Sequence, residues 1–288
     1  MIDYFNPLTV GEYTLSIDNI VLDCWITNKD DKYMIEARIN GMVGCDGIDI
    51  ISWESGKPGT FRRQYLFKLD EDKSFWLGHG LVTTGVDQNR YRMEFNPNKV
   101  GDNSFFKVVH GMLIESSRDV YKHIARFDLA IDIPVDRAKC FLVKDRRLYI
   151  ERRHGVEHTQ YLGAKSATVG RVKLYNKSAE AKLEYPLTRL ELTLDPKTPY
   201  KEIKFPTVYY LHSKHVDDSG VRMTDTDRFI LGAILQGYGT LNDLGRKTRA
   251  KIEELMQNYV CQVSISKKVY ERILREVESY LDVKNNEN

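Results

Sequence analysis

Three segments of this chain alternate apolar and polar residues so regularly that half-buried β-strands are the expected structure. In Phe127–Ile133 the odd positions are apolar, whereas Asp128, Ala130 and Asp132 hold the even positions. Strand side chains point alternately to opposite faces, so one face of this segment packs in a core and the other carries two aspartates. Arg171–Lys177 and Arg189–Leu194 follow the same rule. The chain is therefore expected to build a sheet with one apolar and one polar face.

Other strand candidates fill much of the chain up to about residue 210, bounded by Gly, Asn, Asp and Pro. They are Asn19–Ile26, Tyr33–Ile39, Phe61–Leu69 and Tyr91–Phe95. One helix is expected at Ser117–Ala125, and helical apolar spacing returns in Asp225–Leu235, Leu241–Tyr259 and Lys267–Leu281. The predicted fold class is α+β: a large, mostly antiparallel, twisted sheet with helices on one side and a helical C-terminal segment. We expect one α+β domain at residues 1–212 and the helical segment at residues 213–288.

Short sequence similarities indicate an internal duplication of the sheet. Ile17–Asp23 resembles Phe127–Asp132, and Arg92-Met93-Glu94-Phe95 resembles Arg189-Leu190-Glu191-Leu192. Phe75–Gly78 also resembles Gln160–Gly163. The alternative is coincidence, because short Arg-x-Glu strands recur by chance. If the similarity is real, two related half-sheets share one continuous core.

The composition neither indicates nor excludes nucleic acid as a binding partner. The formal net charge is +2, so a nucleic-acid surface would have to come from local clusters of basic residues. The four cysteines are scattered without a CxxC pair, which favours a reducing compartment such as the cytoplasm. No cationic segment followed by an apolar stretch opens the sequence, and no apolar run approaches the roughly 20 residues of a membrane helix. We expect a soluble cytoplasmic protein that does not contact a membrane.

The polar strand faces carry a particular set of side chains. Lys173, Tyr175 and Lys177 share one face, with Arg171 on the same side, whereas acids occupy the two other strands. A water-facing sheet is the plain alternative, but paired aspartates are poor strand formers and suggest a use. A tyrosine phenol has a pKa near 10 and needs help to act as a nucleophile. The flanking lysines, roughly 7 Å away along the strand, are expected to favour the phenolate.

The acids are candidate ligands for a hard divalent cation. Carboxylates select Mg²⁺ or Mn²⁺, which would polarise a bound phosphate. Asp128 and Asp132 lie about 13 Å apart on one strand, so we expect only one of them to join Glu191 at an ion, and either is possible. Glu180, just past the tyrosine strand, is either a general base or a surface charge. No His-x-His strand occurs, and the pairs His154/His158 and His212/His215 lie in irregular segments.

Basic clusters occur at Lys144–Arg147, Glu151–His154 and Arg246–Lys251, and the first two are expected to form a hairpin. The third begins a helix that could enter a DNA groove. Solvated surface is the alternative for each. The small polar loop Gly163–Gly170 could lie close to a phosphate backbone. The candidate DNA-binding residues are Arg126, Arg146, Arg147, Arg152, Arg153, Lys165, Arg171, Arg189, Arg246, Lys247 and Arg249.

Several of these segments together resemble one family. Tyr161–Gly163, Lys173–Glu180 and Thr188–Glu191 are similar to motifs of the pT181-type plasmid replication initiators, the Rep_trans family, which includes some conjugative relaxases. Arg92–Lys99 and Arg126–Asp132 are also similar, so the resemblance spans roughly residues 75–195, and residues 1–70 show no clear match.

The resemblance implies rolling-circle replication started by metal-dependent nicking of a double-strand origin. Tyr175 would form the covalent 5′-phosphotyrosyl link, with a free 3′-OH that primes synthesis and strand closure at termination. The resemblance also implies a homodimer that acts beside a host helicase.

The residues themselves make Lys173, Lys177 and Glu180 further catalytic candidates beside Tyr175. The expected organisation is then a nicking domain at residues 1–212 and an element for DNA recognition or dimerisation at residues 213–288.

Two other functions remain open from the sequence. A conjugative relaxase would use the same site at a transfer origin. A non-catalytic DNA-binding regulator would use the polar strand faces only as a wet surface. A tyrosine recombinase is disfavoured, because its Arg-His-Arg constellation and mostly helical catalytic domain are not apparent in the sequence.

Overall fold

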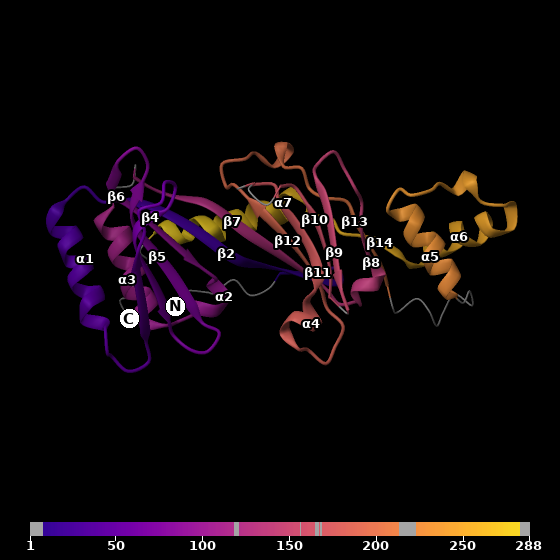
Figure 1. Cartoon of the computed structure of the whole chain (residues 1–288). Coiled ribbons are helices and arrows are strands. Elements are labelled where there is room, and N and C mark those ends of the chain that lie inside the picture. The colour runs from indigo at the N-terminus through magenta and orange to yellow at the C-terminus, as the bar shows by residue number, and fades with distance from the viewer. Residues whose placement is uncertain are drawn as a thin grey trace.

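The computed structural model describes residues 8–117, 121–155, 157–164, 167, 169–212 and 223–282. A sheet of 11 strands dominates it (Figure 1), and every strand pair in the sheet is antiparallel. The α+β prediction is confirmed. The strands of this sheet are β1 (Leu8–Val10), β2 (Tyr13–Trp25), β3 (Asp49–Glu54), β4 (Phe61–Lys68), β5 (Ser74–Val82), β6 (Val86–Phe95), β7 (Lys122–Ile133), β9 (Tyr149–His154), β10 (Glu157–Leu162), β11 (Val172–Asn176) and β12 (Thr188–Leu194).

Three helices pack against the apolar face of this sheet. They are α1 (Lys29–Met42), α3 (Ser104–Ser116) and α7 (Lys267–Glu278). Their buried residues, such as Ile39, Val109 and Ile273, belong to one large core together with apolar residues of β2 and β7. The polar side chains of the strands lie on the other face. The alternation in Phe127–Ile133, Arg171–Lys177 and Arg189–Leu194 therefore predicted correctly which face of β7, β11 and β12 is buried.

The sheet consists of two halves with the same strand order. Outward from the central strand β2 the neighbours are β6, β5, β4 and β3, and outward from the adjacent central strand β7 they are β12, β11, β10 and β9. In each half the chain leaves the central strand, forms the outermost strand and returns inward strand by strand. This topology agrees with the predicted duplication, because β2 corresponds to β7 and β6 to β12. The proposed match of Phe75–Gly78 with Gln160–Gly163 is wrong, since β5 corresponds to β11 and not to β10.

A smaller unit lies at the far end of the molecule from α1 and α3 (Figure 1). It combines the three-stranded sheet of β8 (Cys140–Leu142), β13 (Val208–Leu211) and β14 (Val260–Gln262) with α5 (Asp225–Leu235) and α6 (Arg246–Tyr259). Phe141, Leu231 and Leu255 form its separate small core. Packing thus divides the C-terminal helices, because α5 and α6 lie in the small core and α7 in the large one. The boundary at residue 212 remains a prediction.

Two predicted elements are wrong. Tyr33–Ile39 is helical, within α1, because Ile35, Ile39 and Met42 are buried at helical spacing and Asn28 caps the first turn. The expected helix at Ser117–Ala125 is not found: α3 has already ended at Ser116, and Lys122–Ala125 belong to β7. Short apolar runs fit periods of 2 and of 3.6 almost equally well, which explains the first error.

The remaining described elements are short. They are α2 (Pro97–Val100), α4 (Lys177–Ala181) and the 3-10 turns Arg137–Lys139, Tyr200–Glu202, Leu241–Asp243 and Ser279–Leu281. In the part of the chain that the structure describes, no helix has the length and apolar character needed to cross a membrane.

Candidate functional site

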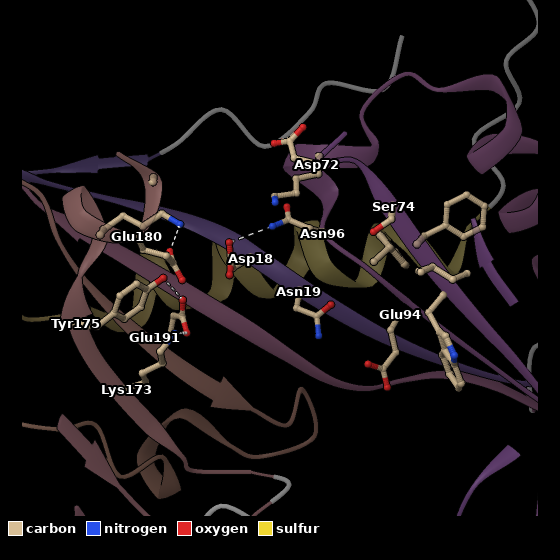
Figure 2. A pocket seen from close by; sticks show the side chains of 17 residues that line it. Asp18, Asn19, Asp72, Ser74, Glu94, Asn96, Lys173, Tyr175, Glu180 and Glu191 are labelled. Atoms are coloured by element: carbon tan, nitrogen blue, oxygen red, sulfur yellow. Dashed lines mark hydrogen bonds and ion pairs between the residues drawn. The ribbon is translucent and has the colours of Figure 1, made fainter. Parts of the chain in front are cut away.

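An open cleft of about 830 Å³ crosses the polar face of the sheet. Figure 2 shows Tyr175, Glu180 and Glu191 on one side of it, Asn96 and Glu94 on the other, and Asp18 and Asn19 between them. Residues of both half-sheets therefore line a single cleft. Its lining comprises Asp18, Asn19, Leu66, Asp72, Ser74, Phe75, Trp76, Glu94, Phe95, Asn96, Lys99, Lys173, Tyr175, Lys177, Glu180, Ala181 and Glu191.

Tyr175 lies in the wall of this cleft rather than in a core. Its side chain is only 5% exposed, yet it belongs to neither hydrophobic core cluster. The hydroxyl donates a hydrogen bond of 2.6 Å to Glu191 Oε1. Lys173 Nζ stands 3.7 Å from the centre of the ring and Lys177 Nζ 6.0 Å. The phenol is thus covered by cationic side chains and directed toward a carboxylate.

Strand register explains why these groups meet. β11 pairs with β12 so that Lys173 lies opposite Glu191 and Tyr175 opposite Arg189. Lys173 Nζ reaches 3.5 Å from Glu191 Oε2, so one carboxylate contacts both the lysine and the phenol. All three side chains project from the polar face, as the alternation predicted.

The electrostatics of Tyr175 differ from the prediction. Burial raises the pKa of the Tyr175 phenol, and the charge and hydrogen bond of Glu191 raise it further. The expectation that the flanking lysines favour the phenolate is wrong for this state, because the hydroxyl's partner is an anion and not a cation. Tyr175 is held protonated, with its proton directed to Glu191.

Glu191 is tuned toward accepting that proton. Burial raises the pKa of its carboxyl, the charge of Lys173 opposes that effect, and the charge of Asp18 adds to it. A carboxylate with a raised pKa is a stronger base than an exposed one. The neighbouring Glu180 behaves differently: burial alone would raise its pKa, but its hydrogen bond from Lys177 Nζ at 2.5 Å helps to lower the pKa overall. Glu180 thus remains ionised and paired.

Asp132 is bound by an arginine. Arg189 Nε and Nη2 donate to the two Asp132 oxygens at 2.6 and 2.7 Å, and Arg189 Nη1 donates to Asp18 at 3.1 Å. Burial alone would lower the pKa of Arg189, but the hydrogen bonds and charge of Asp132 raise it overall. Both Asp132 oxygens are therefore hydrogen-bonded to Arg189. Arg189 also contacts the cleft through its hydrogen bond to Asp18, which lines it.

Asp128 has unused capacity for a ligand. Its Oδ1 is buried and has no hydrogen-bond partner. Burial raises the pKa of the Asp128 carboxyl, hydrogen bonds from Thr193 and Asn19 oppose this, and the charge of Asp18 adds to it. Two aspartates of adjacent central strands therefore repel each other beside the cleft.

Sequence reasoning did not select Asp18 as a site residue. Between Ile17 and Asn19 the pairing of β2 with β7 shifts register, and Asp18 lies at this irregularity. It accepts hydrogen bonds from Asn96 and Arg189. A bulge redirects side chains in a way that regular alternation does not predict. The only available signal was the similarity of the Asp18 segment to the β7 segment.

The acids fit a divalent cation in their donor chemistry. Across the described ranges, no cluster of three or more His, Cys, Asp or Glu side chains forms a metal centre. Mg²⁺, however, is commonly held by one or two carboxylates together with substrate phosphates. The unpartnered Asp128 oxygen and the nearby charge of Asp18 provide such a pair. Asp132 is less suited, because Arg189 occupies both of its oxygens.

The candidate DNA-binding arginines are dispersed over the molecule. Arg126 lies on the polar face, 3.9 Å from Glu94. Arg171 and Arg152 stand over the Tyr161 ring at 5.2 and 5.9 Å. Arg146 is exposed. Arg147 donates to Asp145 and to the Gly170 carbonyl, and Arg153 donates to Glu151. Lys165 lies outside the described residues.

The predicted hairpin of basic clusters is wrong. β9, which carries Arg152 and Arg153, pairs with β10, and Lys144–Arg147 lies in the preceding loop. The third basic cluster opens α6 as expected. Arg246, Lys247 and Arg249 are exposed there, and Arg249 also bonds Glu253 and Asn242.

Comparisons with known proteins give a distant structural neighbour. No protein-family model matches the chain, and no curated protein matches it. A solved structure of a rolling circle replication initiator protein from Geobacillus stearothermophilus is similar at a TM-score of 0.37 and 13% identity. The match covers 92% of this chain and 96% of that chain.

Proposed function

We propose that this protein cleaves one strand of plasmid origin DNA by attack of Tyr175 and thereby initiates rolling-circle replication. The observation that supports it most is the Tyr175 hydroxyl, hydrogen-bonded at 2.6 Å to Glu191 in the wall of an open cleft. A purely structural tyrosine on a wet sheet face needs neither a buried base nor cations around its ring. The resemblance of Lys173–Glu180 to the nicking segment of pT181-type initiators points to the same residue.

The reaction balances with the residues present. The Tyr175 oxygen attacks a phosphodiester phosphorus, and its proton passes to Glu191. A new tyrosyl O–P bond forms, and the bond from phosphorus to the 3′-oxygen breaks. The proton held by Glu191 neutralises the departing 3′-oxygen, which leaves a free 3′-OH and a 5′-phosphate linked to Tyr175. Reversal of these steps rejoins the strand.

The cations of the site bind the charge of the phosphate. Lys173 and Lys177 line the cleft beside the phenol, where they would contact the non-bridging oxygens. Arg189 is already fixed by Asp132 and Asp18. We therefore assign Arg189 a positioning role, because it orients Asp18 and the strand that carries Glu191.

A divalent cation completes the proposal. Asp18 and Asp128 are the side chains that would hold Mg²⁺ or Mn²⁺. Glu191 lies near them but is not needed as a ligand. When bound, such an ion supplies Lewis-acid polarisation of the phosphate. Glu191 then keeps the role of base, which the contact with Tyr175 favours.

Origin recognition is assigned to the smaller unit. Arg246, Lys247 and Arg249 form an exposed basic start to α6, and helices with a basic end are a common means of reading a DNA groove. A second copy of this chain and a host helicase are further proposed partners, which the resemblance to pT181-type initiators implies.

The test uses supercoiled plasmid with and without the cognate double-strand origin, in the presence of Mg²⁺ or Mn²⁺. We expect the unmodified protein to give nicked or relaxed product with protein attached to the 5′ end. Tyr175→Phe is expected to bind the origin and to produce no nick. Equal nicking by both proteins would exclude Tyr175 as the nucleophile. Nicking of a transfer origin but not of the replication origin would instead identify a relaxase.

A further inference from the structure

The half-sheet opposite the proposed nucleophile repeats the framework of the site. In the first half Arg92 lies opposite Asp23, and in the second Arg189 lies opposite Asp132. Each arginine binds both oxygens of its aspartate through Nε and Nη2, at 2.7 and 2.8 Å in the first half and at 2.6 and 2.7 Å in the second. Each half-sheet thus has the same arginine–aspartate ion pair as well as the same strand order.

The same register identifies the counterpart of the nucleophile. Tyr175 lies opposite Arg189 and Lys173 opposite Glu191. In the first half Gly78 lies opposite Arg92 and Trp76 opposite Glu94. Glycine therefore stands where the second half carries tyrosine, and tryptophan stands where it carries lysine.

A side chain cannot be accommodated at Gly78. A Cβ atom there would come within 2.4 Å of the Trp76 ring and 2.6 Å of the Phe61 ring. Phe61 and Trp76 pack edge to face with ring centres 5.6 Å apart. Aromatic rings thus fill the volume that a side chain at Gly78 would enter, and no phenol stands at this counterpart of the Tyr175 position.

Other aromatic and cationic groups gather on the same face. Arg90 stands over the Trp25 ring at 4.9 Å, and Trp25 stacks on His123. Trp53, on β3 at the edge of this half, is 40% exposed. Arg90 and Arg92 share the single carboxylate Asp23, so this group of three side chains has a net positive charge. Aromatic platforms interleaved with arginine suit unpaired nucleic acid, since every base has a face that can stack.

The cleft connects this face to the nucleophile. Its lining runs from Tyr175 and Glu191 through Asp18 to Glu94 and Trp76. Five strand spacings separate β11 from β5, on the order of 24 Å across the sheet. A DNA strand stacked at its 3.4 Å repeat would cross that distance with about seven nucleotides.

We infer that the first half-sheet is a non-catalytic site that binds the unpaired DNA strand next to the scissile phosphate, with Trp76 as a stacking platform and Arg126 as a phosphate contact. This inference rests on the proposed nicking function for the identity of the strand. The two half-sheets share one strand order, and at the same register position one carries the proposed nucleophile and the other has aromatic rings packed around Gly78.

Equilibrium binding of fluorescein-labelled oligothymidylate tests the inference, with affinity read from fluorescence anisotropy. Trp76→Ala and Arg126→Ala are each expected to weaken binding by about tenfold. The matched control is Tyr33→Ala on α1, whose side chain is 73% exposed on the helix-covered side. It should bind as the unmodified protein does. Trp76→Phe retains a stacking ring and is expected to recover most of the affinity, which separates stacking from a folding defect.

A second readout locates the strand directly. Ultraviolet crosslinking of bromodeoxyuridine-substituted strand should attach DNA to the peptide containing Trp76. Unchanged affinity in both variants, or crosslinks confined to peptides of the second half-sheet, would overturn the inference. Plasmid nicking is measured separately, so the two proposals fail independently. If the Trp76 and Arg126 variants lose strand affinity but the unmodified protein does not nick plasmid, the strand site is supported and the nickase is rejected. If the variants bind normally and the unmodified protein nicks plasmid, the nickase is supported and the strand site is rejected.

Discussion

Tyr175 donates its hydroxyl proton toward Glu191 across 2.6 Å, between adjacent strands of one sheet. The phenol is therefore protonated at rest, and in the proposed reaction it would be activated by proton transfer to this carboxylate. Lys173, positioned over the ring and next to Glu191, would then meet the developing negative charge on the phosphate. These proposed roles lead to separate predictions for the base Glu191, for the arginine–aspartate pairs and for the basic start of α6.

Glu191→Gln should slow strand cleavage by about 10²- to 10⁴-fold, the usual contribution of a general base, with DNA affinity retained. The base acts only when ionised. Burial raises the pKa of Glu191 above its ordinary value of 4.5, so the cleavage rate should rise with pH through that raised pKa. Single-turnover rates across pH measure this, and the rising limb should disappear in Glu191→Gln. A limb that survives unchanged in the variant would assign the base elsewhere.

Asp132→Asn and Asp23→Asn form a matched pair, because each removes one carboxylate from an equivalent arginine. Both should lower the free energy of unfolding by about 2–4 kcal/mol, because Arg189 loses its two-point carboxylate partner in the first variant and Arg90 and Arg92 lose theirs in the second. Urea unfolding measures this decrease. Only Asp132→Asn should also reduce the rate of cleavage, through the displacement of Arg189. Equal effects of the two variants on cleavage would show that the pair near Tyr175 has no special role.

Arg246→Ala and Lys247→Ala should each weaken binding to origin duplex. Each should also reduce the slope of log affinity against log salt concentration by about one, because one fewer DNA phosphate is neutralised. Cleavage of a single-stranded substrate should be unaffected, because α6 packs in the small core and its basic residues do not line the cleft. Lys268→Ala, an exposed residue of α7, is the control and should leave the slope unchanged.

His110 should make the protein sensitive to mild acid. Its ring donates a 2.9 Å hydrogen bond to the Tyr280 carbonyl, and burial lowers its pKa from 6.5 to about 4, although that hydrogen bond opposes the shift. Below pH 6.5 the unfolded chain binds a proton that the folded chain does not. Stability is therefore complete above pH 6.5 and declines toward pH 4, by up to about 3 kcal/mol.

Urea unfolding at several pH values measures the effect of His110. His110→Gln keeps a donor for the carbonyl without taking up a proton, so its stability should fall less between pH 6.5 and pH 4. His154→Gln, at an exposed histidine, should retain the full decline. If the two variants show the same pH dependence, His110 does not account for the acid sensitivity.

Much of the candidate site could be predicted from alternation alone. Tyr175, Lys173 and Glu191 each stand on the polar face of a strand whose other face is apolar, and this pattern is visible in the sequence. Their proximity required only that β11 and β12 be neighbours in register. The sequence did not predict that the phenol is held protonated by Glu191 rather than ionised by the lysines. That outcome depends on the contact between the Tyr175 hydroxyl and a Glu191 oxygen.

The remaining features depend on tertiary contacts. Asp18 reaches the cleft through an irregularity in the β2–β7 pairing, which a period of two does not encode. Asp132 has the chemistry of a metal ligand, but Arg189, distant in sequence, binds both of its oxygens. Gly78 could be recognised as the counterpart of Tyr175 only from strand order. Tyr33–Ile39 suited a strand locally, and packing of Ile35 and Ile39 on the sheet made it helical.

The most direct test of the nicking proposal is mass spectrometry of peptides after reaction with a single-stranded origin oligonucleotide. After cleavage, the fragment that ends in the free 3′-OH dissociates, and the covalent intermediate is trapped. We predict a peptide carrying a 5′-linked nucleotide on Tyr175, absent from Tyr175→Phe. An adduct on any other residue, or cleavage of the oligonucleotide without an adduct, would contradict the assignment of Tyr175 as the nucleophile.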